Sequence, residues 1–213
     1  MPKSRLFFAW LTVLLAAFPA RAASLDIQIS DTGGRPAANA VVALTAQNGA
    51  APISRLPVEA VIDQRHETFL PLVTIVRVGG HVIFTNNDTT MHQVYSFSPI
   101  KQFEFEMDEG HRSQPVVFDK PGVASIGCNI HDHMITYVYV ADTPWAGLTD
   151  SKGHAQFADI PAGNYRVDVW HPQLIPGRPA PSTTLAINGP IKFAFSIPLL
   201  AVSPVKHTHM GTY

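Results

Sequence analysis

The chain has 213 residues, with 15 Lys and Arg against 16 Asp and Glu. If the segment that precedes residue 23 is removed, as argued below, 12 basic and 16 acidic residues remain, a charge of about −4 that argues against nucleic acid as a partner. The single Cys excludes an internal disulfide, so this thiol is free, intermolecular or bound to a metal.

The first residues have the pattern of a secretory signal peptide. Lys3 and Arg5 precede an apolar run over residues 6–18, and residues 19–23 then offer an AxA cleavage site near Ala22. The run is too short to span a bilayer comfortably. We therefore expect residues 1–22 to be a signal peptide that directs export to a bacterial periplasm, and we expect no transmembrane segment in the mature chain.

The rest of the chain has the composition of an all-β protein. Eighteen Pro and fourteen Gly punctuate short β-type runs, and no long amphipathic helical pattern is present. About 190 mature residues suffice for one large domain or two small ones. We expect an all-β fold made of β-sandwiches.

Strands are expected in two groups before the middle of the chain. In the first group, residues 25–29 and 40–45 have strand patterns, at the edge of a sandwich, and residues 47–57 read as a connector. The second group begins at Val58 and continues in strand-like runs over residues 59–63, 72–78, 82–85, 95–105 and 116–118.

Residues 128–134, Cys-Asn-Ile-His-Asp-His-Met, are the stretch richest in metal-ligand types. The flanking runs 123–127 and 135–140 read as strands, so this heptapeptide is expected to be the loop of an antiparallel hairpin. A thiolate, imidazoles and a thioether are the donors that copper takes in electron-transfer sites, where two His and one Cys lie roughly in a plane with a weak axial Met. One His is still needed from elsewhere.

The segment from Val78 to Tyr95 supplies it, as a Gly-led strand followed by Asn-Asn-Asp and then Met-His-Gln. At this point the sequence resembles the cupredoxins, which carry a strand of the form GxxVxFxNxD, a ligand His soon after it and a late CxxHxxM loop. The loop spacing is similar to that of amicyanin, and the wider pattern over residues 58–142 is similar to the plastocyanin-like methylamine utilisation proteins. The resemblance implies one mononuclear copper ion held by His92, Cys128, His131 and Met134.

Other residues remain alternatives or have ordinary roles. Met91 and Met107 are alternative axial ligands, and His133 is expected to be an exposed loop residue beside the acceptor surface. Gln93 stands where the family commonly has an Asn that ties the two ligand loops together. The remaining histidines are expected to be structural or solvent-facing, namely His66, His81, His111, His154 and His171, and the tail pair His207 and His209 is expected to have no function.

The segments on both sides of residues 58–142 resemble a second family. Residues 149–170 are similar to the carboxypeptidase-regulatory or prealbumin-like sandwich, and residues 29–44 are similar to the first strands of that module. We therefore expect one smaller sandwich built from residues 24–57 and 145–200, with the Greek-key cupredoxin sandwich inserted and residues 201–213 as a flexible tail. The alternative is that residues 25–45 supply the first strands of the cupredoxin and that residues 145–200 form an appendage.

These patterns favour a periplasmic blue-copper protein that transfers single electrons between redox partners such as a cytochrome or a dehydrogenase. The alternative is a copper-binding, delivery or sensing module without redox turnover, and a weaker one is a one-copper enzyme in which Met134 leaves a coordination position open. The sequence offers no nucleophile with a base, and no second cluster of copper ligands, so we expect a protein that is not an enzyme.

Overall fold

The computed structural model describes residues 23–48, 54–175 and 177–200. The predicted signal peptide and the predicted flexible tail, with His207 and His209, lie outside these residues. The described part of the chain is all-β, as predicted, and contains sixteen strands. No helix that is long and apolar enough to cross a membrane occurs in the described residues.

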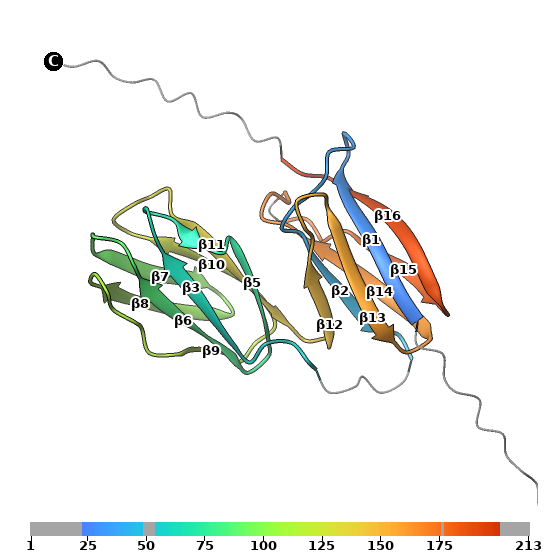
Figure 1. Ribbon diagram of the computed structural model, residues 1–213, viewed down its shortest axis with the longest axis horizontal. Coiled ribbons are helices and arrows are strands. Elements are labelled where there is room, and N and C mark those ends of the chain that lie inside the picture. The colour runs from blue at the N-terminus through green and yellow to red at the C-terminus, as the bar shows by residue number, and fades with distance from the viewer. Residues whose placement is uncertain (1–22, 49–53, 176, 201–213) are drawn as a thin grey trace, which may run out of the picture.

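The strands form four sheets (Figure 1). Their bounds in chain order are β1 Ala23–Asp31, β2 Val41–Ala46, β3 Glu59–Gln64, β4 Phe69–Leu70, β5 Val73–Arg77, β6 Gly80–Asn86, β7 His92–Ser98, β8 Lys101–Met107, β9 Val116–Phe118, β10 Gly122–Cys128, β11 Ile135–Ala141, β12 Trp145–Leu148, β13 His154–Ile160, β14 Gly163–Trp170, β15 Ser182–Ile187 and β16 Pro190–Ile197.

The strands of the two flanks pair with one another. One sheet has the order β13-β1-β16 and the other has the order β12-β2-β14-β15. Strand β1 alternates buried and more exposed residues and lies in the centre of its sheet, antiparallel to β13 and parallel to β16. The expectation that the first two strands form an edge is therefore wrong, because β2 also has a neighbour on each side.

The middle of the chain forms the other two sheets, with the orders β5-β11-β10-β7-β8 and β4-β3-β6-β9. The segment over residues 95–105 is a hairpin rather than a continuous strand, since β7 and β8 pair antiparallel from His92 opposite Met107 to Ser98 opposite Lys101. Its turn at Pro99 and Ile100 contains no Gly or Asn, and apolar and polar residues alternate on both sides of it. The sequence pattern therefore did not predict a turn here.

Two separate hydrophobic clusters lie between these sheets. One draws its buried residues from β1, β2 and β13 to β16 and has Tyr165 as its largest side chain. The other is built from β3 to β11 around Phe69, Phe84 and Phe118 and includes Cys128 and Met134. The exact domain boundaries given above stay a prediction.

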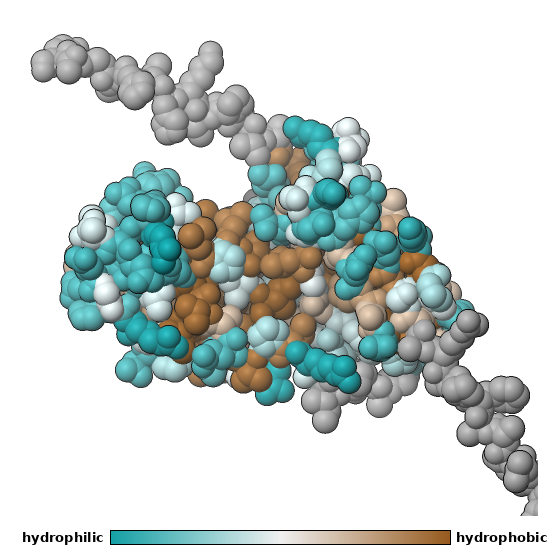
Figure 2. Space-filling view, in the orientation of Figure 1, coloured by the Kyte–Doolittle hydropathy of each residue, from teal (hydrophilic) through white to brown (hydrophobic). Residues whose placement is uncertain are grey.

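The two pairs of sheets lie side by side (Figure 1). They contact each other through aromatic residues. Trp170 of β14 packs against Tyr137 and Tyr139 of β11, with ring centroids 5.4 and 6.2 Å apart. Figure 2 shows apolar surface concentrated over the middle of the molecule, whereas the outer end of the left-hand sandwich is mostly hydrophilic. The loop that joins β10 and β11 lies at that outer end, away from the other sandwich.

Candidate metal centre

The predicted ligand hairpin is present and consists of β10 and β11. The two strands pair antiparallel from Gly122 opposite Val140 to Gly127 opposite Ile135, and Cys128 is the last residue of β10. The loop closes on itself because the Met134 N–H donates to the His131 carbonyl at 3.0 Å. Cys128 is 3% exposed, so its thiol faces the hydrophobic cluster between the sheets.

His92 comes to the same place through the pairing of β7 with β10. In this pair Gly127 is opposite Tyr95 and Cys128 is opposite Val94. Because residues two apart in a strand face the same side of a sheet, His92 shares the inward face with Val94 and Cys128. His92 is fully buried and is the first residue of its strand, rather than a residue of the preceding loop.

Three donor atoms form a small triangle. The Nδ1 atoms of His92 and His131 are 3.1 Å apart, and the Cys128 Sγ lies 3.7 Å from the first and 3.9 Å from the second. By plane geometry, a point equidistant from the three atoms lies about 2.1 Å from each, and imidazole nitrogen and thiolate sulfur bind divalent zinc at about 2.0–2.3 Å. The three side chains therefore fit one first-row metal ion without rearrangement, and the same three emerge as a potential metal-holding group.

A carboxylate lies behind His92. The His92 Nε2 is 2.9 Å from the Asp88 Oδ2, and the same carboxylate accepts hydrogen bonds from the backbone N–H groups of His66 and Glu67. Burial by itself would raise the pKa of Asp88, but these hydrogen bonds and the imidazole outweigh it and lower that pKa below its ordinary value. Asp88 is therefore a carboxylate anion at neutral pH.

The second imidazole reaches the edge of the protein. The side chain of His131 is 18% exposed, and its Nε2 lies 3.7 Å from one oxygen of Glu67. The other oxygen of Glu67 lies 3.7 Å from the Nε2 of His133, which is exposed as predicted. A rim of Glu67 and His133 thus surrounds the outer edge of His131.

Gln93 stands where the cupredoxin pattern commonly has an Asn, and the two ligand loops are nevertheless linked. The Asn129 N–H donates to the Gln93 carbonyl at 3.0 Å, and the Asn129 side-chain amide donates to the Gln93 Oε1 at 2.9 Å. The Gln93 amide in turn donates to Glu104 at 2.7 Å. Gln93 and Asn129 together make the link that the family pattern gives to an Asn beside the first His.

The methionines differ in their surroundings. Met134 is buried in the same hydrophobic cluster as Cys128, and its axial role stays a prediction. Met107 is also buried, but its sulfur accepts a hydrogen bond from the Gln64 amide at 3.2 Å. Met91 is exposed. Of the two alternatives, Met107 already has a partner and Met91 points into solvent.

The other described histidines lie outside the triangle. His81 pairs with Glu59 and His111 with Asp108, while His154 lies near Asp26. The buried His171 has its pKa lowered by burial, and its Nε2 contacts the Ala38 carbonyl. The sequence reading missed two functional candidates, Asp88 and Glu67. The only signal for Asp88 was its place four residues before His92.

The donor set defines what the site can do. One soft thiolate and two imidazoles suit copper in both of its common oxidation states, and a buried trigonal arrangement is typical of blue-copper sites. Oxygen donors, which magnesium and calcium require, do not belong to the triangle. Binding of copper by these residues remains a prediction that the geometry supports.

No protein-family model and no curated protein matches the chain. Among solved structures, a purple cupredoxin from Nitrosopumilus maritimus is 25% identical over 38% of this chain and 99% of its own, with a TM-score of 0.35. Amicyanin from Paracoccus versutus is 18% identical over 46% of this chain and 97% of its own, with a TM-score of 0.35. The copper-containing nitrite reductase of Thermus scotoductus is 24% identical over 45% of this chain and 24% of its own, with a TM-score of 0.37.

A two-sheet sandwich holds a Cys at the end of one hairpin strand, a His in the following loop and a second His on the neighbouring strand. The middle part of the chain therefore has a cupredoxin-like fold with a His-Cys-His cluster suited to copper.

Proposed function

We propose that this chain is an exported blue-copper protein that carries single electrons between redox partners. The observation that carries the proposal is the triangle of two imidazole nitrogens and one thiol sulfur, with edges of 3.1, 3.7 and 3.9 Å. His92, Cys128, His131 and Met134 would hold one copper ion. Copper would supply the one-electron couple.

Rigid placement of the donors favours this use. His92 and Cys128 lie on paired strands, and the loop that carries His131 is fixed by its own hydrogen bond and by the link between Gln93 and Asn129. Ligands that stay in place whichever oxidation state the metal has reduce the reorganisation that accompanies electron transfer. The same arrangement disfavours an open position for substrate, so we propose a carrier rather than an enzyme.

The electron would leave through the exposed edge of His131. Ile130, the neighbouring loop residue, is 46% exposed and Met91, which precedes His92, is 42% exposed. These two exposed apolar side chains, in a rim that is otherwise polar because of Glu67 and His133, would offer another redox protein a small docking contact. A cytochrome or a dehydrogenase is the proposed donor or acceptor.

Loading the purified protein with Cu(II) tests the proposal. We expect an intense visible band from thiolate-to-Cu(II) charge transfer and a reversible one-electron potential. Cys128→Ser should abolish the band, whereas His111→Ala, a change at an exposed histidine outside the triangle, should leave it intact. A colourless Cu(II) complex of the wild type would refute the electron-carrier proposal.

A copper-delivery role is the second candidate, and the rim favours it. Glu67 and the exposed His133 lie beside the outer edge of His131, where an incoming or departing ion would pass. Under this alternative, copper leaves readily to a competing chelator and the site does not cycle. Cyclic voltammetry combined with a chelator competition separates the two functions.

We also propose the wider organisation of the chain. Residues 1–22 would direct export to the periplasm, residues 58–142 would be the copper domain, and residues 24–57 and 145–200 would form one flanking sandwich. The pairing of β1 with β13 and β16 supports this division. Expression with and without residues 1–22, followed by fractionation of the host cell, tests the export signal.

A further inference from the structure

We propose that Asp88, clamped by the backbone of a tight turn at His66 and Glu67, is the positioning residue that presents His92 to the metal. This inference deepens the proposed function, since it concerns the same cluster. It assigns a role to two segments, residues 65–68 and Asp88, that contain none of the four predicted ligands.

The first step is the tautomer of His92. Both oxygens of the Asp88 carboxyl group accept a backbone N–H, so this group faces its neighbours as an acceptor, and the His92 Nε2, 2.9 Å from the Oδ2, is placed to donate to it. The Nδ1 is then left with a free lone pair, and this is the atom that lies 3.7 Å from the Cys128 sulfur. Imidazole ligands commonly have their second nitrogen fixed by a carboxylate in this manner, which sets both the tautomer and the ring orientation.

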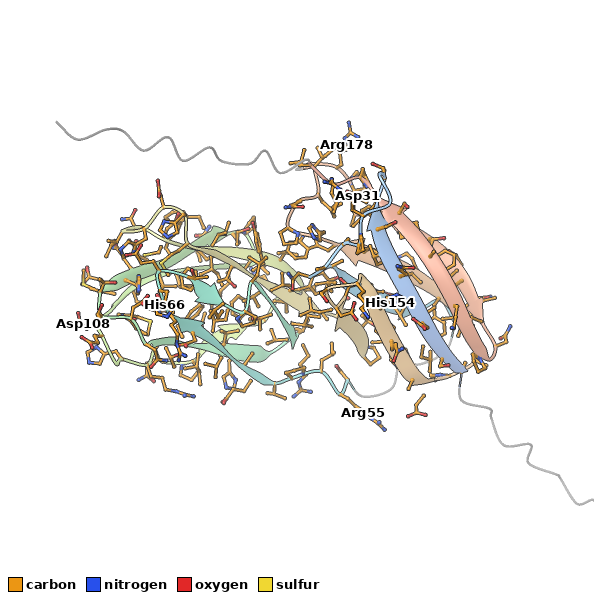
Figure 3. All side chains as sticks on the ribbon, turned by 45° about the horizontal axis from the view of Figure 1, so that its top comes forward. Asp31, Arg55, His66, Asp108, His154 and Arg178 are labelled. Carbon is orange, nitrogen blue, oxygen red and sulfur yellow. The ribbon has the colours of Figure 1, made fainter. Side chains whose placement is uncertain are left out.

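The second step is the anchoring of Asp88 itself. Its side chain is 10% exposed, and its Oδ1 and Oδ2 accept the N–H groups of His66 and Glu67 at 2.5 and 2.9 Å. These contacts join the hairpin of β3 and β4 to the segment before β7. Figure 3 shows His66 in the left-hand sandwich, the one that carries the ligand loop.

The third step is the unusual composition of this turn. Arg65 and Thr68 exchange backbone hydrogen bonds around two residues with φ angles of 52° and 51°, the pattern of a type I′ hairpin turn. Such turns favour Asn-Gly, because side chains disfavour positive φ, yet His66 and Glu67 occupy them here. Residues that oppose the local preference are expected at functional positions, where another requirement overrides it.

Glu67 shows what that requirement is. Its backbone N–H holds Asp88, which orients His92, while its carboxylate lies 3.7 Å from the Nε2 of His131. Glu67 therefore acts on both imidazoles of the cluster. Its backbone acts on His92 through the hydrogen bonds of Asp88, and its carboxylate lies near His131. An Asn-Gly turn would keep the backbone geometry and lose the carboxylate.

Nitrogen-15 NMR of the metal-free protein tests the proposal directly. We expect the His92 Nε2 to be protonated and its Nδ1 to be bare in the wild type, and we expect the tautomer to become mixed in Asp88→Asn. Metal affinity, measured with Zn(II) against a chelator, should fall about 10- to 100-fold in Asp88→Asn. The control Asp108→Asn removes an exposed carboxylate on the same sandwich and should change the affinity less than 2-fold.

A second variant separates the turn backbone from its side chains. The double change His66→Asn with Glu67→Gly keeps both N–H donors, so the His92 tautomer should remain as in the wild type. A protonated His92 Nδ1 in the wild type, or equal Zn(II) affinities for Asp88→Asn and Asp108→Asn, would overturn the proposal. The wild-type tautomer decides the question even if Asp88→Asn does not fold.

These outcomes are distinguishable from failure of the proposed function. If the wild type binds Cu(II) without colour but shows the expected His92 tautomer and its loss in Asp88→Asn, the positioning role stands and the electron-carrier role falls. If the colour is present and the tautomer is reversed, the carrier role stands and Asp88 is not its positioning residue.

Discussion

Tyr139 allows a quantitative test of the contact between the two sandwiches. It lies on β11, the strand that follows the ligand loop, and its ring packs against Trp170. Burial raises the pKa of Tyr139 to about 12, with further contributions from the charges of Asp142 and Asp168. An unfolded chain leaves this phenol at its ordinary pKa of about 10.

The sign of the pH dependence follows from these two pKa values. Between about pH 10 and pH 12 the unfolded chain releases the phenolic proton while the folded protein retains it. The contribution of Tyr139 to the free energy of unfolding is therefore fully present below pH 10, and it is lost as the pH rises toward the pKa of the folded protein. The free energy of unfolding falls by at most about 1.4 kcal/mol for each pH unit, or about 3 kcal/mol over the two units between the pKa values. This is an upper limit, because the phenol is only partly buried.

Chemical denaturation at fixed pH values from 8 to about 11.5 measures this loss, and Tyr139→Phe is the matched variant. Phe keeps the ring against Trp170 but has no proton to release, so the alkaline decline should become shallower. A shallower decline should remain in the variant, because burial also raises the pKa values of Tyr137 and Tyr165. Identical pH profiles for wild type and Tyr139→Phe would show that this contact does not exist in solution.

Three further experiments probe the candidate site. His131→Gly should lose the copper colour and regain it with added imidazole, whereas His92→Gly should not be rescued, because the side chain of His131 is partly exposed and that of His92 is fully buried. Asn129→Ala removes the amide link between the ligand loops and should cost about 0.5–1.5 kcal/mol in denaturation, with faster metal loss to a chelator. Gly127→Ala places a Cβ 2.9 Å from the Tyr95 ring and should cost about 1–3 kcal/mol, most of it recovered when Tyr95→Ala is added.

The sequence predicted the parts of the fold that have local signals. Alternation of apolar and polar residues located most strands of the ligand sandwich to within a few residues, and the hairpin around the heptapeptide is present as expected. Pairing between distant strands has no such signal. The parallel pair of β1 and β16 joins residues from opposite ends of the chain, and it depends on a shared hydrophobic cluster that only the folded chain displays.

The same division applies to the site. Cys128 and His131 lie close together in the sequence, so their spacing identifies them as expected ligands. The Gly-led strand that precedes His92 identifies it as the third. Asp88 looked like an ordinary turn residue in Asn-Asn-Asp, and Glu67 lay in a segment with no ligand pattern. Their roles come from side-chain directions across three loops, which no spacing along the chain encodes.

Strand register links the fold to the chemistry. The triangle requires that His92 and Cys128 face inward from neighbouring strands, and this depends on Cys128 lying opposite Val94. A slip of one residue would turn one of the two side chains outward, because successive residues in a strand face opposite sides. Two independent contacts oppose such a slip: the link between Asn129 and Gln93 at the end of the strand pair, and the close fit of the Tyr95 ring over Gly127. The residues that hold the register are therefore the immediate neighbours of the ligands, so a change that loosens the sheet here disturbs the metal site before it unfolds the protein.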